Sequence, residues 1–246
     1  MDLVIGSAGC LGAAVSTALV RSGRPVRALD LNPSRLDGVE EWVGDMGDAA
    51  LLSRALEGVT TVHQCASVLS LNPGRRPELW ATNVERNRRV IERSREAGVR
   101  AFVYASNHLL TCNRGEHARG LDESAPYATE ALSAYVASRI ASERDVLAAD
   151  DPGAGFRTIA LRTPTLYGPR DRFHFNLQLA LADAGRGARV RGQRHCSHIY
   201  AENAAHAHVL AGDALRAGAH GGKAYHLADE APPPSYWDLM DRLLIA

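Results

Sequence analysis

The fold of this chain is decided by the stretch Asp2-Leu3-Val4-Ile5-Gly6-Ser7-Ala8-Gly9-Cys10-Leu11-Gly12. A short apolar run ends in three glycines with the spacing GxxGxxG, and a helix pattern follows over residues 13–22. Glycines between a strand and a helix permit a tight turn and close packing of the helix on the strand. The free N–H groups at the start of that helix can bind an anion such as a phosphate. The stretch therefore predicts a strand, an anion-binding turn and a helix.

An acidic residue completes this pattern at the end of the next strand. The apolar segment 25–29 is followed by Asp30, at the distance that a dinucleotide-binding fingerprint requires. A carboxylate there binds the ribose hydroxyls of a dinucleotide and repels a 2′-phosphate. Leu31 and Asn32 follow it, and the first arginine after it is Arg35. We therefore expect the cofactor to be NAD rather than NADP, and we disfavour the alternative of a flexible glycine loop without a ligand.

Strand and helix patterns alternate along the rest of the chain. We expect strands at 59–65, 101–105 and 158–162, and helices at 49–57, 78–97, 133–149 and 236–245. Such alternation is typical of a parallel sheet with helices on both faces. The predicted fold is thus a Rossmann-type, doubly wound α/β fold. We assign residues 1–165 to an NAD-binding domain and residues 166–246 to a reduced substrate-binding region, interleaved in one compact unit.

Composition excludes several classes of protein. The 246 residues carry a net charge of zero, which gives no indication of binding to nucleic acid or to an anionic membrane. No apolar run approaches the roughly 20 residues that span a bilayer, and no leader pattern opens the sequence. The four cysteines are too far apart for a metal or redox motif, so we expect free thiols and a cytoplasmic protein.

A metal site is also not expected. His206 and His208 stand two residues apart, so their side chains diverge on a helix, and no acidic or cysteine partner has a suitable spacing. We interpret them as hydrogen-bonded histidines on a helix face.

The segment SAYVASRIASE, residues 133–143, contains a pair of residues that could take part in catalysis. Tyr135 and Arg139 are four residues apart and share one face of the predicted helix. A cation beside a tyrosine favours the phenolate, which can then exchange a proton with a carbonyl or hydroxyl oxygen. Alone, a pair at this common spacing favours a core tyrosine and a solvated surface arginine. The dinucleotide signal elsewhere in the chain favours the catalytic interpretation.

Several further motifs resemble the extended short-chain dehydrogenase/reductase superfamily. They are Gly44-Asp45-Met46, His63-Gln64-Cys65-Ala66-Ser67, Asn83-Val84 and Leu161-Arg162-Thr163-Pro164-Thr165-Leu166-Tyr167-Gly168-Pro169. Within it, residues 198–211, 223–230 and Tyr236-Trp237 resemble the 3β-hydroxysteroid dehydrogenase/sterol-4-carboxylate dehydrogenase group. The resemblance covers nearly the whole chain.

The resemblance implies a cofactor site and a catalytic set. The implied cofactor-binding residues are Gly6, Ser7, Gly9, Cys10, Leu11, Gly12, Asp30, Asp45, Met46, Cys65, Ala66, Ser67, Tyr135, Arg139, Pro164 and Thr165. The implied catalytic residues are Tyr135, Arg139 and Asn107. Two of these depart from the family pattern, because Arg139 stands at the position of a lysine and Asn107 at that of a serine. Asn107 can still donate a hydrogen bond through its amide. Ser106 precedes it and should face the other side of the strand.

Three functions are compatible with these residues. The first is an NAD-dependent oxidoreductase that interconverts a secondary alcohol and a ketone on a small hydrophobic, sterol-like or polyketide-like substrate. The second is a non-redox isomerase, dehydratase or cyclase on the same scaffold, and the third is an NAD-binding sensor without turnover. The resemblance also implies a homodimer formed through the helices at 78–97 and 133–149.

Overall fold

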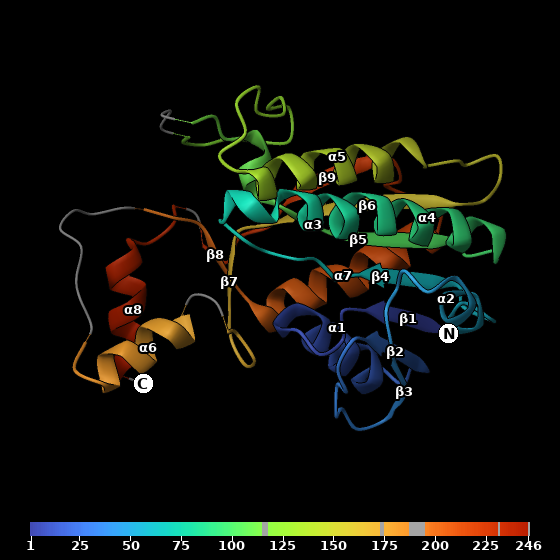
Figure 1. The fold of residues 1–246 in the computed structure, drawn as a ribbon, viewed down its shortest axis with the longest axis horizontal. Coiled ribbons are helices and arrows are strands. Elements are labelled where there is room, and N and C mark those ends of the chain that lie inside the picture. Colours follow the sequence, from blue (N-terminus) through green and yellow to red (C-terminus); the bar gives the residue numbers. More distant parts are fainter. Residues whose placement is uncertain (115–117, 173–174, 187–194, 231, 246) are drawn as a thin grey trace.

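The computed structural model of the protein describes residues 1–114, 118–172, 175–186, 195–230 and 232–245. Its centre is a sheet of seven parallel strands in the order β3-β2-β1-β4-β5-β6-β9 (Figure 1). The strands are β1 Asp2–Ile5, β2 Val26–Asp30, β3 Val39–Val43, β4 Thr61–Gln64, β5 Ala101–Asn107, β6 Arg157–Thr163 and β9 Lys223–His226. The predicted doubly wound α/β fold is confirmed, and its strand order reverses between β1 and β4, where such folds bind ligands.

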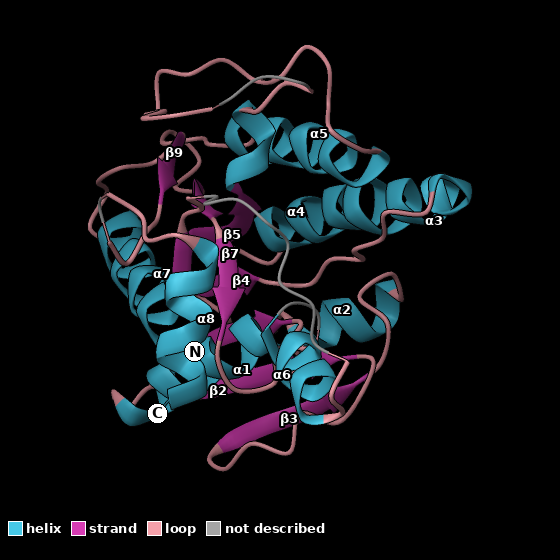
Figure 2. Cartoon of the chain, turned by 90° about the vertical axis from the view of Figure 1, so that its left-hand side faces the viewer, coloured by secondary structure: helices cyan, strands magenta, loops and turns pink. Residues whose placement is uncertain are grey.

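Helices cover both faces of the sheet. On one face lie α1 (Cys10–Arg21) and α7 (Ala201–Arg216), which bury Leu19 and Ala205 against β1 and β2. On the other face lie α2 (Ala49–Ala55), α4 (Asn87–Glu96) and α5 (Ala134–Ala148). Their Leu52, Val90 and Val146 pack with alternate residues of β1, β2 and β5. This alternation follows from the two-residue period of a strand, and Figures 1 and 2 show the resulting three layers.

Local signals in the sequence set the ends of the helices. The Ser133 hydroxyl accepts a hydrogen bond from the Val136 N–H at 3.2 Å and so caps the start of α5. Asp48 caps α2 in the same way. Gly98 follows α4 with a φ of +76°, a conformation that suits glycine.

The structure differs from the predicted elements in several places. Helix α1 begins at Cys10, within the glycine stretch, and not at residue 13. The single helix predicted over 78–97 is three segments, α3 (Arg76–Trp80), a π-helical turn at Ala81–Arg86 and α4. Strand β3 was not predicted, because its sequence VEEWV is polar and half exposed at the edge of the sheet.

The segment after residue 165 contributes to both parts of the molecule. It forms the small parallel pair β7 (Thr165–Tyr167) and β8 (His198–Tyr200), and the helices α6 (Phe175–Asp183) and α8 (Tyr236–Ile245). These lie beside the main sheet in Figure 1. The same segment also supplies α7 and β9 to the main sheet. Among the described residues, no helix is long and apolar enough to cross a membrane.

Candidate active site

A large cleft of about 1190 Å³ lies at the carboxyl ends of the central strands. It is lined by residues of the glycine turn, of the ends of β2, β4 and β5, and of α5. A smaller cavity of about 220 Å³ adjoins it and shares Gly6, Gly9, Asp30, Cys65 and Ser67 with it. The cleft therefore stands at the reversal of strand order, where the fold predicts a ligand.

The glycine turn lines the cleft, and two of its glycines, Gly6 and Gly12, leave no space for a side chain. A Cβ atom on Gly12 would lie 2.1 Å from the Gly6 carbonyl oxygen, and one on Gly6 would lie 2.6 Å from the Ala66 nitrogen. Gly9 differs, since its nearest neighbour would be the Gly6 oxygen at 3.3 Å. Gly6 and Gly12 hence allow the turn itself, whereas Gly9 leaves the side facing the cleft open. Gly9 precedes α1 without a side-chain cap, so the first N–H groups of the helix point at the cleft.

Asp30, the residue expected to bind ribose hydroxyls, is held in place at the end of β2. Its carboxylate accepts hydrogen bonds from the backbone N–H of Ala8 at 3.1 Å and of Asn32 at 2.9 Å. The bond from Ala8 ties the end of β2 to the glycine turn, and the bond from Asn32 holds the start of the loop after β2. Asp30 lines both cavities, and Arg35 lines the larger one.

The smaller cavity gathers three further residues of the expected cofactor site. It is lined by Asp45, Met46 and Ala66, together with Thr82 and Arg86. The Asp45 carboxylate forms an ion pair with Arg86 at 3.2 Å and accepts a hydrogen bond from the Gly47 N–H at 2.7 Å. Arg86 had not been predicted. The sequence feature that could have indicated it is its position three residues after Asn83, on the same helical segment.

Two thiols line the cleft without adding charge to it. Burial, assisted by Asp171, raises the pKa of Cys10 to about 11. Burial also raises the pKa of Cys65 to about 12, although Arg139 opposes the shift. Both groups are therefore protonated near pH 7 and do not repel a pyrophosphate.

Ser7 is placed differently from the rest of the glycine stretch. It is fully buried and lines neither of the two cavities, and its hydroxyl has no hydrogen-bond partner among the described residues. The other predicted cofactor residues line one cavity or both. The larger cleft contains Gly6, Gly9, Cys10, Leu11, Gly12, Asp30, Cys65, Ser67, Tyr135, Arg139, Pro164 and Thr165, and the smaller one adds Asp45, Met46 and Ala66.

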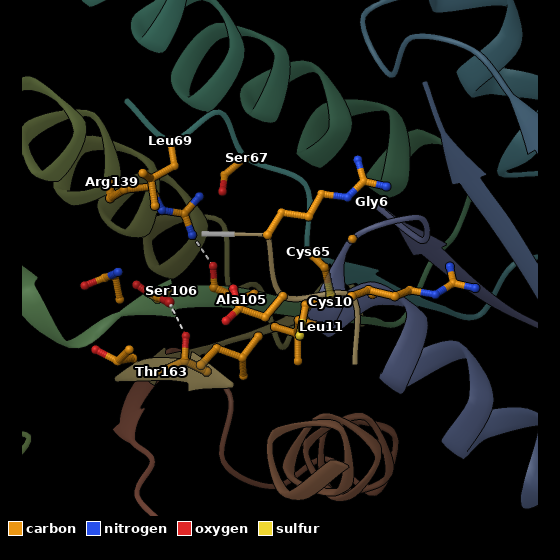
Figure 3. Close-up of a pocket in the computed structure, with 18 of the residues that line it drawn as sticks. Gly6, Cys10, Leu11, Cys65, Ser67, Leu69, Ala105, Ser106, Arg139 and Thr163 are labelled. Atoms are coloured by element: carbon orange, nitrogen blue, oxygen red, sulfur yellow. Dashed lines mark hydrogen bonds between the residues drawn. The ribbon is translucent and has the colours of Figure 1, made fainter. Parts of the chain in front are cut away.

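The three predicted catalytic residues line the same cleft from two elements. Tyr135 and Arg139 come from α5, and Asn107 comes from the end of β5. Tyr135 and Arg139 are buried, and the Arg139 guanidinium donates a hydrogen bond to the Ala105 carbonyl (Figure 3). The helical spacing has thus brought the pair to the cleft as predicted, although Arg139 makes its described contacts with β5.

The orientation of the Asn107 amide is fixed by the backbone. Its side-chain oxygen accepts a hydrogen bond from the Leu109 N–H at 2.8 Å. The amide NH₂ is consequently the group that can donate to a ligand oxygen. His108 follows in the lining and its Nδ1 lies 3.2 Å from the Thr163 carbonyl oxygen, while burial lowers its pKa.

A buried cluster beneath the cleft was not identified from the sequence. The Glu143 carboxylate, which is fully buried, accepts hydrogen bonds from the guanidinium of Arg162 at 2.7 Å and from the Tyr127 hydroxyl at 2.9 Å. It also accepts one from the hydroxyl of Ser106, a residue that lines the cleft beside Asn107. The signal was visible in the spacing, because Tyr135, Arg139 and Glu143 recur every four residues on one face of α5.

One segment from the C-terminal part reaches across to the adenosine end. Arg170, with a φ of +65°, donates a hydrogen bond to the Ser34 carbonyl at 2.7 Å. Arg170 and the neighbouring Asp171 and Arg172 line the large cleft. This contact links β7 to the loop after β2 across the cleft.

The histidines of α7 do not form a metal site with other described residues. No group of three or more potential ligands is found in the described ranges. His206 is exposed. His208 is fully buried beside His63, with ring centroids 5.8 Å apart, and its ring nitrogens have no hydrogen-bond partner in the described part of the chain, whereas His63 Nε2 lies 3.5 Å from the Asp2 carboxylate. The expectation of a hydrogen-bonded helix-face histidine is therefore wrong at position 208.

Comparison with known families and proteins gives a consistent result. The model of the 3-beta hydroxysteroid dehydrogenase/isomerase family matches residues 3–246. A mouse protein, "Sterol-4-alpha-carboxylate 3-dehydrogenase, decarboxylating", is 32% identical over 98% of this chain and 67% of its own length. A 2-alkyl-3-oxoalkanoate reductase of Stenotrophomonas maltophilia is 32% identical over 99% of this chain and 74% of its own. The chain thus spans about two thirds to three quarters of these relatives.

Solved structures agree with the sequence comparison. MoeE5 in complex with UDP-glucose and NAD superposes with a TM-score of 0.85 at 25% identity, over 98% of this chain and 81% of that one. A short-chain dehydrogenase/reductase superfamily protein from Agrobacterium tumefaciens with bound NAD gives a TM-score of 0.78 at 28% identity, over 100% of this chain and 82% of that one.

Proposed function

The chain belongs to the 3-beta hydroxysteroid dehydrogenase/isomerase family, and from that premise we propose that it binds NAD and interconverts a secondary alcohol and a ketone on a small hydrophobic substrate. The observation that carries the proposal is the position of Tyr135, Arg139 and Asn107. All three line the cleft that the glycine turn and Asp30 also line. Proton-transfer and dinucleotide-binding groups therefore share one cavity.

The residues at the cofactor end fit NAD. Gly9 leaves the start of α1 open to a pyrophosphate, and the two neighbouring thiols are uncharged. Asp30 offers carboxylate oxygens to ribose hydroxyls and opposes a 2′-phosphate. When bound, NAD supplies the acceptor or donor of the hydride.

The other residues manage the proton and the substrate oxygen. In alcohol oxidation, the Tyr135 oxygen takes the hydroxyl proton as the carbonyl forms, and in ketone reduction it returns that proton. The Arg139 guanidinium, a buried cation on the same helix face, provides positive charge that can offset negative charge developing on the Tyr135 oxygen during the transfer. Asn107 donates its amide N–H to the substrate oxygen, because its own carbonyl oxygen is already held by Leu109.

The proposed class of substrate follows from the lining beyond the cofactor end. It contains five leucines from the loop after β4, the start of α5, the segment after β5, and β7: Leu69, Leu71, Leu109, Leu132 and Leu166. Leu71 is 73% exposed, so this apolar wall continues to the surface. An apolar cavity with a few polar groups at one end favours a sterol-like or polyketide-like alcohol or ketone.

Replacement of Tyr135 by phenylalanine tests the function. Purified protein is assayed with NAD(H) and a panel of hydrophobic secondary alcohols and ketones, while calorimetry measures NAD affinity. Tyr135→Phe should abolish turnover and leave NAD affinity unchanged, because it removes only the oxygen that carries the proton. Tyr225→Phe, on β9 and absent from the cleft lining, serves as the matched control and should retain turnover. Turnover by Tyr135→Phe at the parent's rate would overturn the mechanism.

A parent protein that binds NAD and turns over none of the panel would favour the non-redox enzyme or the sensor. Product analysis after incubation with catalytic NAD separates these two. An isomerised or dehydrated product indicates the former, and an unchanged substrate indicates the latter.

A further inference from the structure

Arg139 is a buried cation with an unusual set of partners. Its side chain is 3% exposed, and none of the described residues forms a salt bridge with it. It donates to the Ala105 carbonyl, and its Nε has no partner among the described residues. A buried charge is normally paired with an opposite charge, so other groups must hold this one in place.

The aromatic ring of Tyr104 supplies that support. The Arg139 Cζ lies 4.6 Å from the centroid of the Tyr104 ring. Tyr104 is 1% exposed and lies on β5, directly before Ala105, with its ring on the face that α5 covers. One strand thus gives Arg139 a ring face and, from the next residue, a carbonyl oxygen. The negative face of an aromatic ring attracts a cation, and the attraction is larger when water is excluded.

The geometry suits arginine better than lysine. A guanidinium is flat and can stack on a ring while its edge donates hydrogen bonds. A lysine ammonium is a compact charge that gains less from a flat surface. Tyr104 on β5 therefore suits the arginine that this chain has at position 139, where the family pattern has a lysine.

We propose that Tyr104 is a positioning residue that holds the Arg139 guanidinium beside the cleft and thereby enables arginine to support proton transfer at Tyr135. The inference rests on the proposed function for its catalytic consequence. Its structural part, the coupling of Tyr104 and Arg139, stands separately. Burial raises the pKa of the Tyr104 hydroxyl to about 12, so Tyr104 is neutral near pH 7 and acts through its ring.

A double-mutant cycle tests the proposal. The variants are Tyr104→Leu, Arg139→Lys and their combination, with Tyr104→Phe as the matched control that retains the ring. For each variant, kcat and KM are measured against pH, NAD affinity is measured by calorimetry, and stability is measured by urea unfolding. If Tyr104→Leu does not fold, Tyr104→Met replaces it, since methionine fills irregular gaps in a core.

The expected result is a loss that depends on residue 139. With alcohol substrates, Tyr104→Leu should lower kcat about tenfold in the Arg139 protein and move the ascending limb of the pH profile to higher pH, because the displaced cation no longer offsets negative charge on the Tyr135 oxygen. In the Arg139→Lys background the same change should lower kcat less than threefold. Tyr104→Phe should stay within about threefold of the parent and keep its pH profile. An equal loss in both backgrounds, with an unmoved pH profile, would reduce Tyr104 to a packing residue and overturn the proposal.

The failure of the proposed function gives a different pattern. If the parent itself turns over no substrate, the cycle is evaluated from urea unfolding alone. Non-additive losses of stability then support the contact between Tyr104 and Arg139, and additive losses overturn it.

Discussion

Glu143 and Arg162 form a buried ion pair, with the Arg162 guanidinium donating to the carboxylate at 2.7 Å, directly beneath the candidate active site. The side chains are 0% and 5% exposed. Arg162 is on β6 and Glu143 is on α5, one turn after Arg139 and two turns after Tyr135. The pair therefore fixes the helix that presents the proposed catalytic residues to the strand that forms the cleft floor.

Removal of one partner from this pair should destabilise the fold. We expect Glu143→Gln to lower the free energy of unfolding by about 3–5 kcal/mol, because it leaves the Arg162 charge buried without compensation. The control is Asp145→Asn on the same helix, which breaks a more exposed pair with Arg88 and should cost less than about 1 kcal/mol. Urea unfolding measures both, and similar losses would contradict the assigned importance of the buried pair.

Two glycines of the turn, Gly9 and Gly12, should respond differently to substitution. Gly12→Ala should prevent folding or strongly destabilise the protein, since its Cβ would lie 2.1 Å from the Gly6 oxygen. Gly9→Val should still fold, because its Cβ would meet only the Gly6 carbonyl oxygen, at 3.3 Å, but it should lose NAD binding by occupying the pyrophosphate position. Thermal unfolding and calorimetric titration with NAD distinguish the two effects. Full NAD affinity in Gly9→Val would show that the turn does not bind the cofactor.

Asp30 should determine the choice between the two nicotinamide cofactors. The parent is expected to bind NAD(H) more tightly than NADP(H), and Asp30→Ala should narrow that difference, because it removes the repulsion of a 2′-phosphate. The variant also loses the hydrogen bonds to Ala8 and Asn32, so some loss of NAD affinity is expected. Calorimetry with both cofactors measures the ratio, and preferential binding of NADP(H) by the parent would contradict the assignment.

The buried histidine pair should make the fold sensitive to mild acid. Burial lowers the pKa of His63 and lowers that of His208 well below the usual value of 6.5. Below that value the unfolded chain takes up protons that the native state does not, so the free energy of unfolding falls as the pH falls. The slope is up to about 1.4 kcal/mol per pH unit for each histidine.

Asp2, the charged group next to the histidine pair, changes the stability in the same direction: its contribution is also lost as the pH falls. Asp2 lies 3.5 Å from His63, and although burial would raise its pKa, His63 and Arg24 outweigh burial and hold it below its usual value. Its contribution is lost only at more acidic pH. His208→Leu should flatten the dependence of stability on pH between about 5 and 7, while His206→Leu, at the exposed neighbouring position, should not. Equal slopes for all three proteins would exclude this origin.

Much of the cofactor end could be predicted from the sequence because it depends on local backbone geometry. Gly6, Gly12 and Asp30 are specified by one turn and two strand ends, and their spacing carries the information. The face of α5 was also predictable, since helical periodicity places Tyr135 and Arg139 together. Strand alternation predicted that Ser106 and Asn107 face opposite sides, and the Ser106 hydroxyl does bond Glu143, but both residues line the large cleft because β5 ends there.

Other features depend on contacts between distant segments. The Tyr104 ring reaches Arg139, and Arg170 reaches Ser34, only after separate elements have packed. Strand β3 was missed because an edge strand needs few buried residues and so carries a weak apolar pattern. Each of these features depends on tertiary packing, so residue spacing within one segment does not predict it.

The late position of β9 in the chain has a consequence for synthesis on the ribosome. β6 pairs with β5 on one side and with β9 on the other. The segment from Pro164 to Gly222 is translated between them. Until it has emerged, the nascent sheet exposes the backbone of β6 as a bare edge, which is a template for pairing with another chain. Slow translation of that segment should therefore favour aggregation. Codons that are translated quickly within it should raise the yield of soluble protein.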